Sequence, residues 1–407
     1  LAMFLGNVSP LLIVCGLLDI ALDMKTVLIQ NAMFVAAIAT LLQLYPIRRF
    51  GSRLPIVMGT SSGFIGTAQI IGSAFGYGAL MGASMVGSLF EMVLGFFIRP
   101  LRKLFPPIVT SLVIVTMGLT LLPVGINYLG GGAGAADFGS LQHLGVGFFV
   151  MLVILIAKQM KGFINDISIL IGIVAGYLLA IALGMVDFQP VAEAAWISLP
   201  QFLPVMPTFH MEAILAMGIM FVATAVETIG NISGITNGAF DREATIEEMQ
   251  GGVLADSAGS FFGSFFGVLP CTAFAQNVGL VVVSKIVNRF VIMTGAVFLL
   301  LCGFCPKLSA LFSVMPQSVL GGAAVIMFAM ILVSGIQSLA REPIDERAGL
   351  IIALSLGLGV GIGNVPEVLA QLPQWVSSIF AQNSIIMTFV IATLLNLLLP
   401  KKKKAEE

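Results

Sequence analysis

Glu227 is an acidic residue in the middle of an apolar stretch, GIMFVATAVETIGNISGI. A carboxylate at the centre of a membrane helix costs roughly 2.5 to 3.5 kcal/mol, and such residues usually line ion or substrate paths. Its carboxyl group can accept hydrogen bonds from two adjacent N–H groups of a flat ring, and it can exchange a proton. The alternative is a protonated group that only packs. Asn231 follows at i+4 on the same helix face, so we predict a ligand-binding and ion-coupling face there.

Three further acids lie in apolar segments. Asp256, in GGVLADSAGSFFG, stands among small residues that permit close helix approach. It is either an ion-coupling group or a cap for a broken helix end. Glu91 and Asp166 lie nearer to the basic residues Arg99 and Lys161, and we expect them to reach toward these helix ends or to pair there.

Gln276 and Asn277 are adjacent amides in LPCTAFAQNVG, and together they offer donors and acceptors that suit the edge of a purine or pyrimidine. The alternative is that they bond only neighbouring backbone. A second segment, LPIVMGTSSGFIG, has the same Leu-Pro opening and places Ser61 and Ser62 opposite these amides. The correspondence favours a site formed by both segments.

The elements that must position these residues are membrane helices. Only 10% of the 407 residues are charged and 58% are hydrophobic, with a mean hydropathy of +1.07. Apolar runs long enough to cross about 30 Å of hydrocarbon recur along the chain. We predict an all-α polytopic membrane protein of fourteen transmembrane segments, at 1–20, 24–45, 55–75, 76–98, 106–122, 141–160, 163–185, 209–234, 249–267, 268–286, 289–306, 316–338, 346–364 and 382–400.

Basic residues follow every second segment, so both termini should be cytoplasmic. Fourteen segments then divide into two inverted repeats of seven. The motif Gly6-Asn7-Val8-Ser9 is repeated as Gly230-Asn231-Ile232-Ser233, which supports this division. Segments 55–62 and 270–277 each begin with Pro and continue with poor helix formers, so we expect extended chain before helix. Such breaks are tolerated only where they are buried in protein or line a cavity.

Other motifs carry less information. The four cysteines lie in or beside apolar segments, and neither His143 nor His210 has metal-ligand spacing. We find no nucleotide-binding loop, hydrolase elbow or HExxH motif, and predict no enzyme activity, cofactor, metal or nucleic-acid partner. The first residues already resemble a membrane helix, so we expect the numbering to begin inside it.

The stretch QNVGLVVVSK, residues 276–285, resembles the signature of the nucleobase-ascorbate transporter family, [QEP]-N-x-G-x4-T-[RKG]. Only Ser284 departs from it, and it keeps the hydroxyl group of Thr. The resemblance extends through Glu227 with Gly230, through LADSAGS around Asp256 and through GTSSGF. It therefore covers essentially the whole chain.

This resemblance implies a core domain, 1–105 and 209–308, and a gate domain, 106–208 and 309–407. It also implies short strands in the third and tenth segments, a homodimer, and an elevator-type movement of core against gate. A base would bind between the strand-bearing segments, with Glu227 and Gln276 on its edge and Asn277 supporting the site. The residues implied to surround the base are Ser61, Ser62, Gly63, Phe64 and Ala275.

The Gln at position 276 resembles that of xanthine and uric acid carriers, whereas uracil carriers have Glu there. We therefore expect import of a purine base, coupled to protons through Glu227, Asp256 and the face of Asn231. Many relatives have His or Asp in place of Asn231, which cannot titrate itself. Open alternatives are a uracil permease, a sodium-coupled carrier, an anion exchanger or channel of the same architecture, and a membrane scaffold.

Overall fold

The protein is described by a computed structural model that covers residues 2–98, 106–132, 135–274, 277–278, 281, 285–340, 344–372 and 384–400. Ala275, Gln276 and Ser284 lie outside these ranges. The described chain is mostly helical, and it divides into two compact units. These are Leu1–Ile98 with Pro123–Ile326, and Arg99–Leu122 with Met327–Glu407.

The first unit contains the strands and most of the helices. Its helices are α1 (Ala2–Leu17), α2 (Leu22–Leu44), η1 (Ser62–Phe64), α3 (Ile65–Phe75), α4 (Tyr77–Phe96), α7 (Leu141–Gln159), α8 (Phe163–Asp166), α9 (Ser168–Ala182), α10 (Gln189–Glu193), α11 (Met211–Ala239), α12 (Ile246–Phe265), α14 (Arg289–Cys302) and α15 (Pro306–Ser313). Its core is apolar except for a group of buried polar residues that the following section describes.

The second unit contains α17 (Glu346–Asn364), η2 (Pro366–Leu369) and α19 (Ser384–Leu398). Two helices, α6 (Pro107–Leu129) and α16 (Gln317–Leu339), belong in part to each unit. Within the second unit, Thr116 of α6 donates a hydrogen bond to Thr388 of α19 at 3.0 Å. The domain boundaries predicted from the family resemblance stay a prediction.

Seven helices among the described residues are long and apolar enough to cross a membrane: α2, α4, α6, α7, α11, α16 and α17. The pair α14 and α15 meets the same test together but is bent by 84°. Shorter apolar helices cover Gly6–Leu17, Ser168–Ala182 and Ser384–Leu398. The chain is therefore a multi-pass helical protein, and the count of fourteen spans stays a prediction.

One predicted helix end is wrong. The segment 106–122 was expected to end before Pro123, but α6 continues through this residue to Leu129. A proline inside a membrane helix removes one backbone hydrogen bond, and packed neighbours can compensate for that loss. The proline is therefore no stop signal in this helix.

The strands β1 (Met58–Thr60) and β2 (Cys271–Ala273) pair as a two-stranded antiparallel sheet. Both are buried along their whole length. The register pairs Met58 with Ala273, Gly59 with Thr272, and Thr60 with Cys271. A short strand was expected in each of segments 55–75 and 268–286, and each is present.

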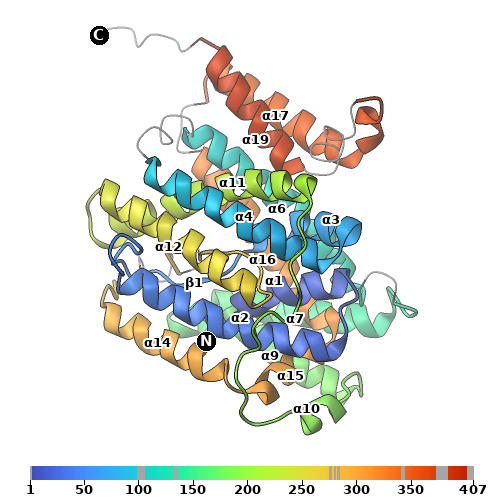
Figure 1. Cartoon of the computed structure of the whole chain (residues 1–407). Helices are drawn as coiled ribbons and strands as arrows, with labels where there is room; N and C mark the ends of the chain where they lie inside the picture. Colours follow the sequence, from blue (N-terminus) through green and yellow to red (C-terminus); the bar gives the residue numbers. More distant parts are fainter. Residues whose placement is uncertain are drawn as a thin grey trace. The chain divides into compact units, whose positions relative to one another are not determined.

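Helices α4, α11 and α12 pack against one another beside this sheet (Figure 1). Glycines and other small residues of α4 and α12 permit the close approach, as is typical of helix packing in membranes. Helices α1 and α2 pack against β1, and α11 and α12 pack against β2. The sheet is thus enclosed by helices from both halves of the sequence.

Candidate functional site

The two strands exchange further backbone hydrogen bonds at their ends. Ser61 N–H donates to the Pro270 carbonyl at 2.9 Å, and Phe274 N–H donates to the Val57 carbonyl at 3.0 Å. Extended backbone at membrane depth would otherwise leave these groups unsatisfied, at several kcal/mol each. The two broken segments therefore provide hydrogen-bond partners for each other's backbone groups.

A buried hydroxyl group secures the first residue of each strand. Thr40 of α2 accepts a hydrogen bond from Met58 N–H at 3.0 Å and donates to the Met58 carbonyl at 3.2 Å. Ser260 of α12 accepts from Cys271 N–H at 2.9 Å and donates to the Cys271 carbonyl at 3.2 Å. The two strands are anchored in the same way.

A buried asparagine contacts the last residue of each strand. Asn7 of α1 accepts from Thr60 N–H at 2.8 Å through Oδ1 and donates to the Ala32 carbonyl at 3.0 Å through Nδ2. Asn231 of α11 donates to the Ala273 carbonyl at 2.8 Å. These are the two asparagines of the repeated Gly-Asn motif. The structure thus gives Asn231 a bond to β2 beside the predicted ion-coupling face.

The chain after β1 turns into helix at the predicted position. Ser61 caps η1, because its Oγ accepts from Gly63 N–H at 3.2 Å. Ser62 is partly exposed, whereas Gly63 and Phe64 are buried. The Phe64 ring packs on Phe221 with centroids 4.9 Å apart. The polar groups of this turn that can face a ligand are therefore those of Ser62 and the backbone beside it.

Asn277 belongs to the described part of the chain after β2. Its side chain is 3% exposed and its Nδ2 donates to the Pro55 carbonyl at 2.8 Å. This bond joins the tenth predicted segment to the start of the third. Asn277 thus connects the two segments, and its predicted role in supporting a bound base stays a prediction, since Ala275 and Gln276 lie outside the described residues.

Glu227 lies on α11, one turn before Asn231, and is partly exposed. Its buried Oε2 has no hydrogen-bond partner among the residues that the structure describes. A buried polar atom without a partner is uncommon, and it needs a ligand, a water molecule or a proton to explain it. The carboxyl group can therefore accept hydrogen bonds from a bound molecule.

Asp256 is fully buried on α12, next to α11 and β2. Its Oδ2 accepts a hydrogen bond from Thr228, and Thr228 Oγ1 lies 3.2 Å from Thr272 Oγ1. Within the described ranges its Oδ1 has no partner. Thr228 directly follows Glu227 in the chain, so the residue that bonds Asp256 is the sequence neighbour of the other acid. The side-chain hydrogen bond of Asp256 in the described chain thus comes from Thr228 of α11, while the hydroxyl groups of Ser257 and Ser260 donate to the Leu254 and Cys271 carbonyls.

The prediction that Glu91 reaches toward the basic end of its helix is wrong, whereas its pairing with Arg99 stays a prediction because Arg99 lies outside the described residues. The Glu91 side chain is 0% exposed, and neither oxygen has a hydrogen-bond partner in the described part of the chain. Glu91 lies on the face of α4 that packs against α11 and α12, where it cannot reach solvent. The side chain of Asp166 and the residue Arg99 lie outside the described part.

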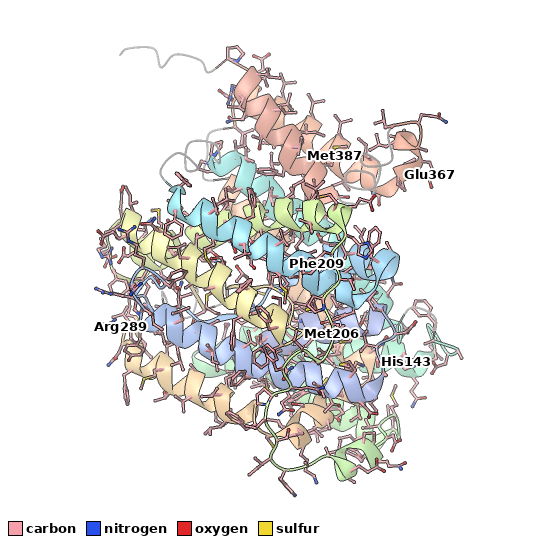
Figure 2. The ribbon with its side chains drawn as sticks, in the orientation of Figure 1. His143, Met206, Phe209, Arg289, Glu367 and Met387 are labelled. Atoms are coloured by element: carbon pink, nitrogen blue, oxygen red, sulfur yellow. The ribbon has the colours of Figure 1, made fainter. Side chains whose placement is uncertain are left out.

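The two histidines have local partners. His143, labelled in Figure 2, begins α7, and its Nε2 lies 2.8 Å from Asp137 Oδ2. His210 precedes α11 and stacks on Phe75 with ring centroids 4.8 Å apart. All four cysteines are free thiols, of which Cys15, Cys271 and Cys302 are buried.

Sequence reasoning missed the uncharged residues that secure the site. Thr40, Thr228, Ser260 and Thr272 stand in apolar stretches where a hydroxyl group most often bonds its own helix backbone. Asn7 was noted for its motif, but without a role. The Gly-Asn motif that precedes each of the two Leu-Pro segments was the available signal.

Known proteins resemble this chain in sequence and in fold. A family model described as "Permease family" matches residues 1–368. A xanthine permease of Bacillus subtilis is 35% identical over 416 residues, which cover 100% of this chain and 94% of the relative. The uric acid permease PucK of the same organism is 36% identical over 404 residues, covering 97% and 92%.

Among solved structures, the transmembrane domain of the cyanobacterial bicarbonate transporter BicA superposes with a TM-score of 0.57. The alignment covers 96% of this chain and 97% of that domain, at 12% sequence identity. At that identity the likeness concerns the fold alone.

Proposed function

The chain belongs to this permease family, and from that premise we propose that it is a secondary active symporter that imports xanthine or uric acid with protons. It is a membrane transporter and not an enzyme, and its substrates are nucleobases. We propose which purine it carries, which ion drives it and how it moves.

The observation that carries the proposal is the position of Glu227. A partly exposed carboxyl group whose Oε2 has no partner among the described residues lies on α11, which packs against the sheet whose first strand is followed by η1 and α3. Helix N-termini and a carboxylate together offer donors and acceptors to a flat polar ring. We propose that Glu227 and Gln276 bond the edge of the base. Ser62 and the backbone of residues 61, 63, 64 and 275 line the remainder, and Asn277 supports it.

We propose fourteen spans in two inverted repeats, with core 1–105 and 209–308 moving against gate 106–208 and 309–407 as an elevator. The matched anchors support the repeat: a hydroxyl group at the start of each strand, from Thr40 and Ser260, and an asparagine at its end. We propose that both termini lie in the cytoplasm, because basic residues follow every second span. From the family resemblance we also propose a homodimer in the plasma membrane.

Proton coupling is proposed through Glu227 and Asp256, with Asn231 holding β2 beside them. Asn231 cannot titrate, so the acids must bind the proton. Sodium is the alternative ion. Uptake that collapses with a protonophore and survives sodium removal supports protons, and the reverse result supports sodium.

The test of the substrate is uptake of labelled xanthine by cells that express the protein. We expect competition by excess unlabelled xanthine and by uric acid, with little effect of uracil. Gln276→Glu should shift the preference toward uracil. Competition by uracil alone would replace the proposal with a uracil permease. Uptake of bicarbonate or sulfate, with no uptake of any base, would replace it with an anion exchanger.

A further inference from the structure

Glu91 is held between two helices by the packing of its own helix. Gly87 and Gly95 lie one turn before and one turn after it, on the same face of α4. A Cβ atom at Gly87 would lie 2.5 Å from Phe221 of α11, and one at Gly95 would lie 3.0 Å from Leu254 of α12. The face that contains Glu91 is therefore in direct contact with both helices.

Two titratable groups from the elements packed around it interact electrostatically with Glu91. They are Asp256 of α12 and the Cys271 thiol of β2, and Glu227 of α11 interacts in turn with Asp256. The ion pairs found within the described residues involve neither Glu91 nor Asp256. Nothing basic in that part of the chain compensates these two acids.

Two carboxylates cannot both stay ionised in such a site. Like charges in a water-excluded interior repel strongly, and the usual outcome is that one proton is shared by the pair. Two ionised carboxylates also cannot satisfy each other, because each only accepts hydrogen bonds. One proton resolves both problems, since it makes one group a donor to the other.

The contacts indicate which group holds the proton. Asp256 Oδ2 already accepts from Thr228, and a donated hydrogen bond stabilises the ionised form. Among the described residues, no group donates a hydrogen bond to either Glu91 oxygen or to Asp256 Oδ1. A protonated Glu91 would supply the missing donor to Asp256 Oδ1.

We infer that Glu91 and Asp256 form a buried pair that holds the coupling proton, which makes Glu91 a further ion-coupling residue. In the closed state the pair carries one proton and a charge of −1. When the site opens to the inner water, the O–H bond of Glu91 breaks and the proton passes to water. Contact with the outer water reverses this step. The inference rests on the proposed proton symport through Glu227 and Asp256, and it adds Glu91 as the group that holds the proton beside Asp256.

The test uses purified full-length protein in lipid vesicles, with Glu91→Gln compared with the unchanged chain. We expect Glu91→Gln to keep exchange of labelled xanthine across the membrane, since Glu227 is intact. Accumulation driven by an imposed pH gradient should fall at least about tenfold, and xanthine-driven acidification of the vesicle interior should be lost. Full accumulation by Glu91→Gln would overturn the inference while leaving the proposed function in place.

If the protein without any substitution exchanges no base in this assay, the proposed function is overturned, and the inference with it. Accumulation that follows a sodium gradient and ignores the pH gradient would overturn the proton coupling in the proposed function, and the inference with it, while leaving the substrate assignment in place. A second measurement needs no transport: the infrared absorption of protonated carboxyl groups. We expect Glu91→Gln to lose one such band and Asp256→Asn to shift it, whereas Glu248→Gln at the exposed start of α12 leaves it unchanged. A band that neither buried variant alters would overturn the inference.

Discussion

The segments around β1 and β2 are anchored alike but differ in charge. Glu227 stands four residues before Asn231, and the residue four before Asn7 is Met3. Asp256 stands four residues before Ser260, and the residue four before Thr40 is Ala36. The uncharged anchors are thus present in both halves, whereas these two acids occur in the second half only.

This difference separates two tasks. The hydroxyl and amide anchors satisfy the backbone of a broken segment, which each half needs for folding. The acids satisfy no backbone group, and Glu227 and Asp256 each keep one buried oxygen without a partner in the described chain. We therefore assign coupling to α11 and α12, which pack on β2, together with Glu91 of α4 against them, and assign to α1 and α2, which pack on β1, a structural role.

The largest expected effect is that of Glu227→Gln on transport. Loss of a charged hydrogen-bond partner costs about 1.5–3 kcal/mol, which is about 10- to 100-fold in rate or affinity. The initial rate of xanthine uptake should fall by at least that factor, at unchanged protein level in the membrane. Met3→Leu at the matching position of the first half is the control and should transport normally. Equal uptake by Glu227→Gln would remove the assignment of the acid.

The next largest effect is expected on stability, for Gly59→Ala at the centre of β1. The added Cβ would lie 2.5 Å from the Phe274 ring and 2.8 Å from Asn7 Oδ1. Overpacking of this kind typically costs about 1–3 kcal/mol, so the melting temperature in detergent should drop. Gly66→Ala in α3 is the control, because its Cβ would have nothing within 4 Å. Equal melting temperatures for the two variants would contradict the packing described for β1.

The two asparagines offer a smaller and paired comparison. Asn7→Ala removes partners from the Thr60 N–H and the Ala32 carbonyl, whereas Asn231→Ala removes one from the Ala273 carbonyl. Each buried group left unsatisfied costs about 1–3 kcal/mol. We expect Asn7→Ala to lower the melting temperature more than Asn231→Ala, and Asn231→Ala to lower uptake more. The opposite ranking in both measurements would refute the division of tasks.

The smallest effect is expected at the start of α12, outside the predicted span 249–267. Thr245 and Glu248 form a capping box there, and Arg242 donates a hydrogen bond to Glu248 Oε1 at 2.5 Å. In the first half, by contrast, Ala21 at the N-cap of α2 makes no side-chain cap bond. The hydrogen bond from Arg242 lowers the pKa of Glu248.

The stabilisation by the Glu248 carboxylate is present above its unfolded pKa, about 4.3, and is lost as the pH falls through the lower folded pKa. Because the pair is partly exposed, it contributes at most about 1 kcal/mol. The melting temperature of Glu248→Gln should lie slightly below that of the unchanged chain at neutral pH. The gap should close in strong acid, and a gap that is independent of pH would contradict the ionic contribution.

Much of this arrangement could be predicted from the sequence. The Leu-Pro openings and the poor helix formers after them predicted extended chain in two segments, and the paired strands confirm it. The signature at residues 276–285 predicted the family, which the family match confirms. These signals are local in the chain, so they need no knowledge of packing.

The parts that sequence reasoning missed depend on packing between distant helices. Glu91 was assigned to a helix end because basic residues follow it in the chain, yet it is buried between α11 and α12. Thr40 and Ser260 look like ordinary polar residues of apolar helices until the strands beside them are placed. Pro123 was treated as a helix stop, which is a rule for isolated helices.

The most direct measurement is a cryo-EM structure of the protein with bound xanthine. We predict density for the base between residues 61–64 and 275–278, with the Glu227 carboxyl group hydrogen-bonded to the ring edge. Density for the base at another place, with Glu227 bonded only to protein, would contradict the central claim that this acid and the two broken segments form the substrate site.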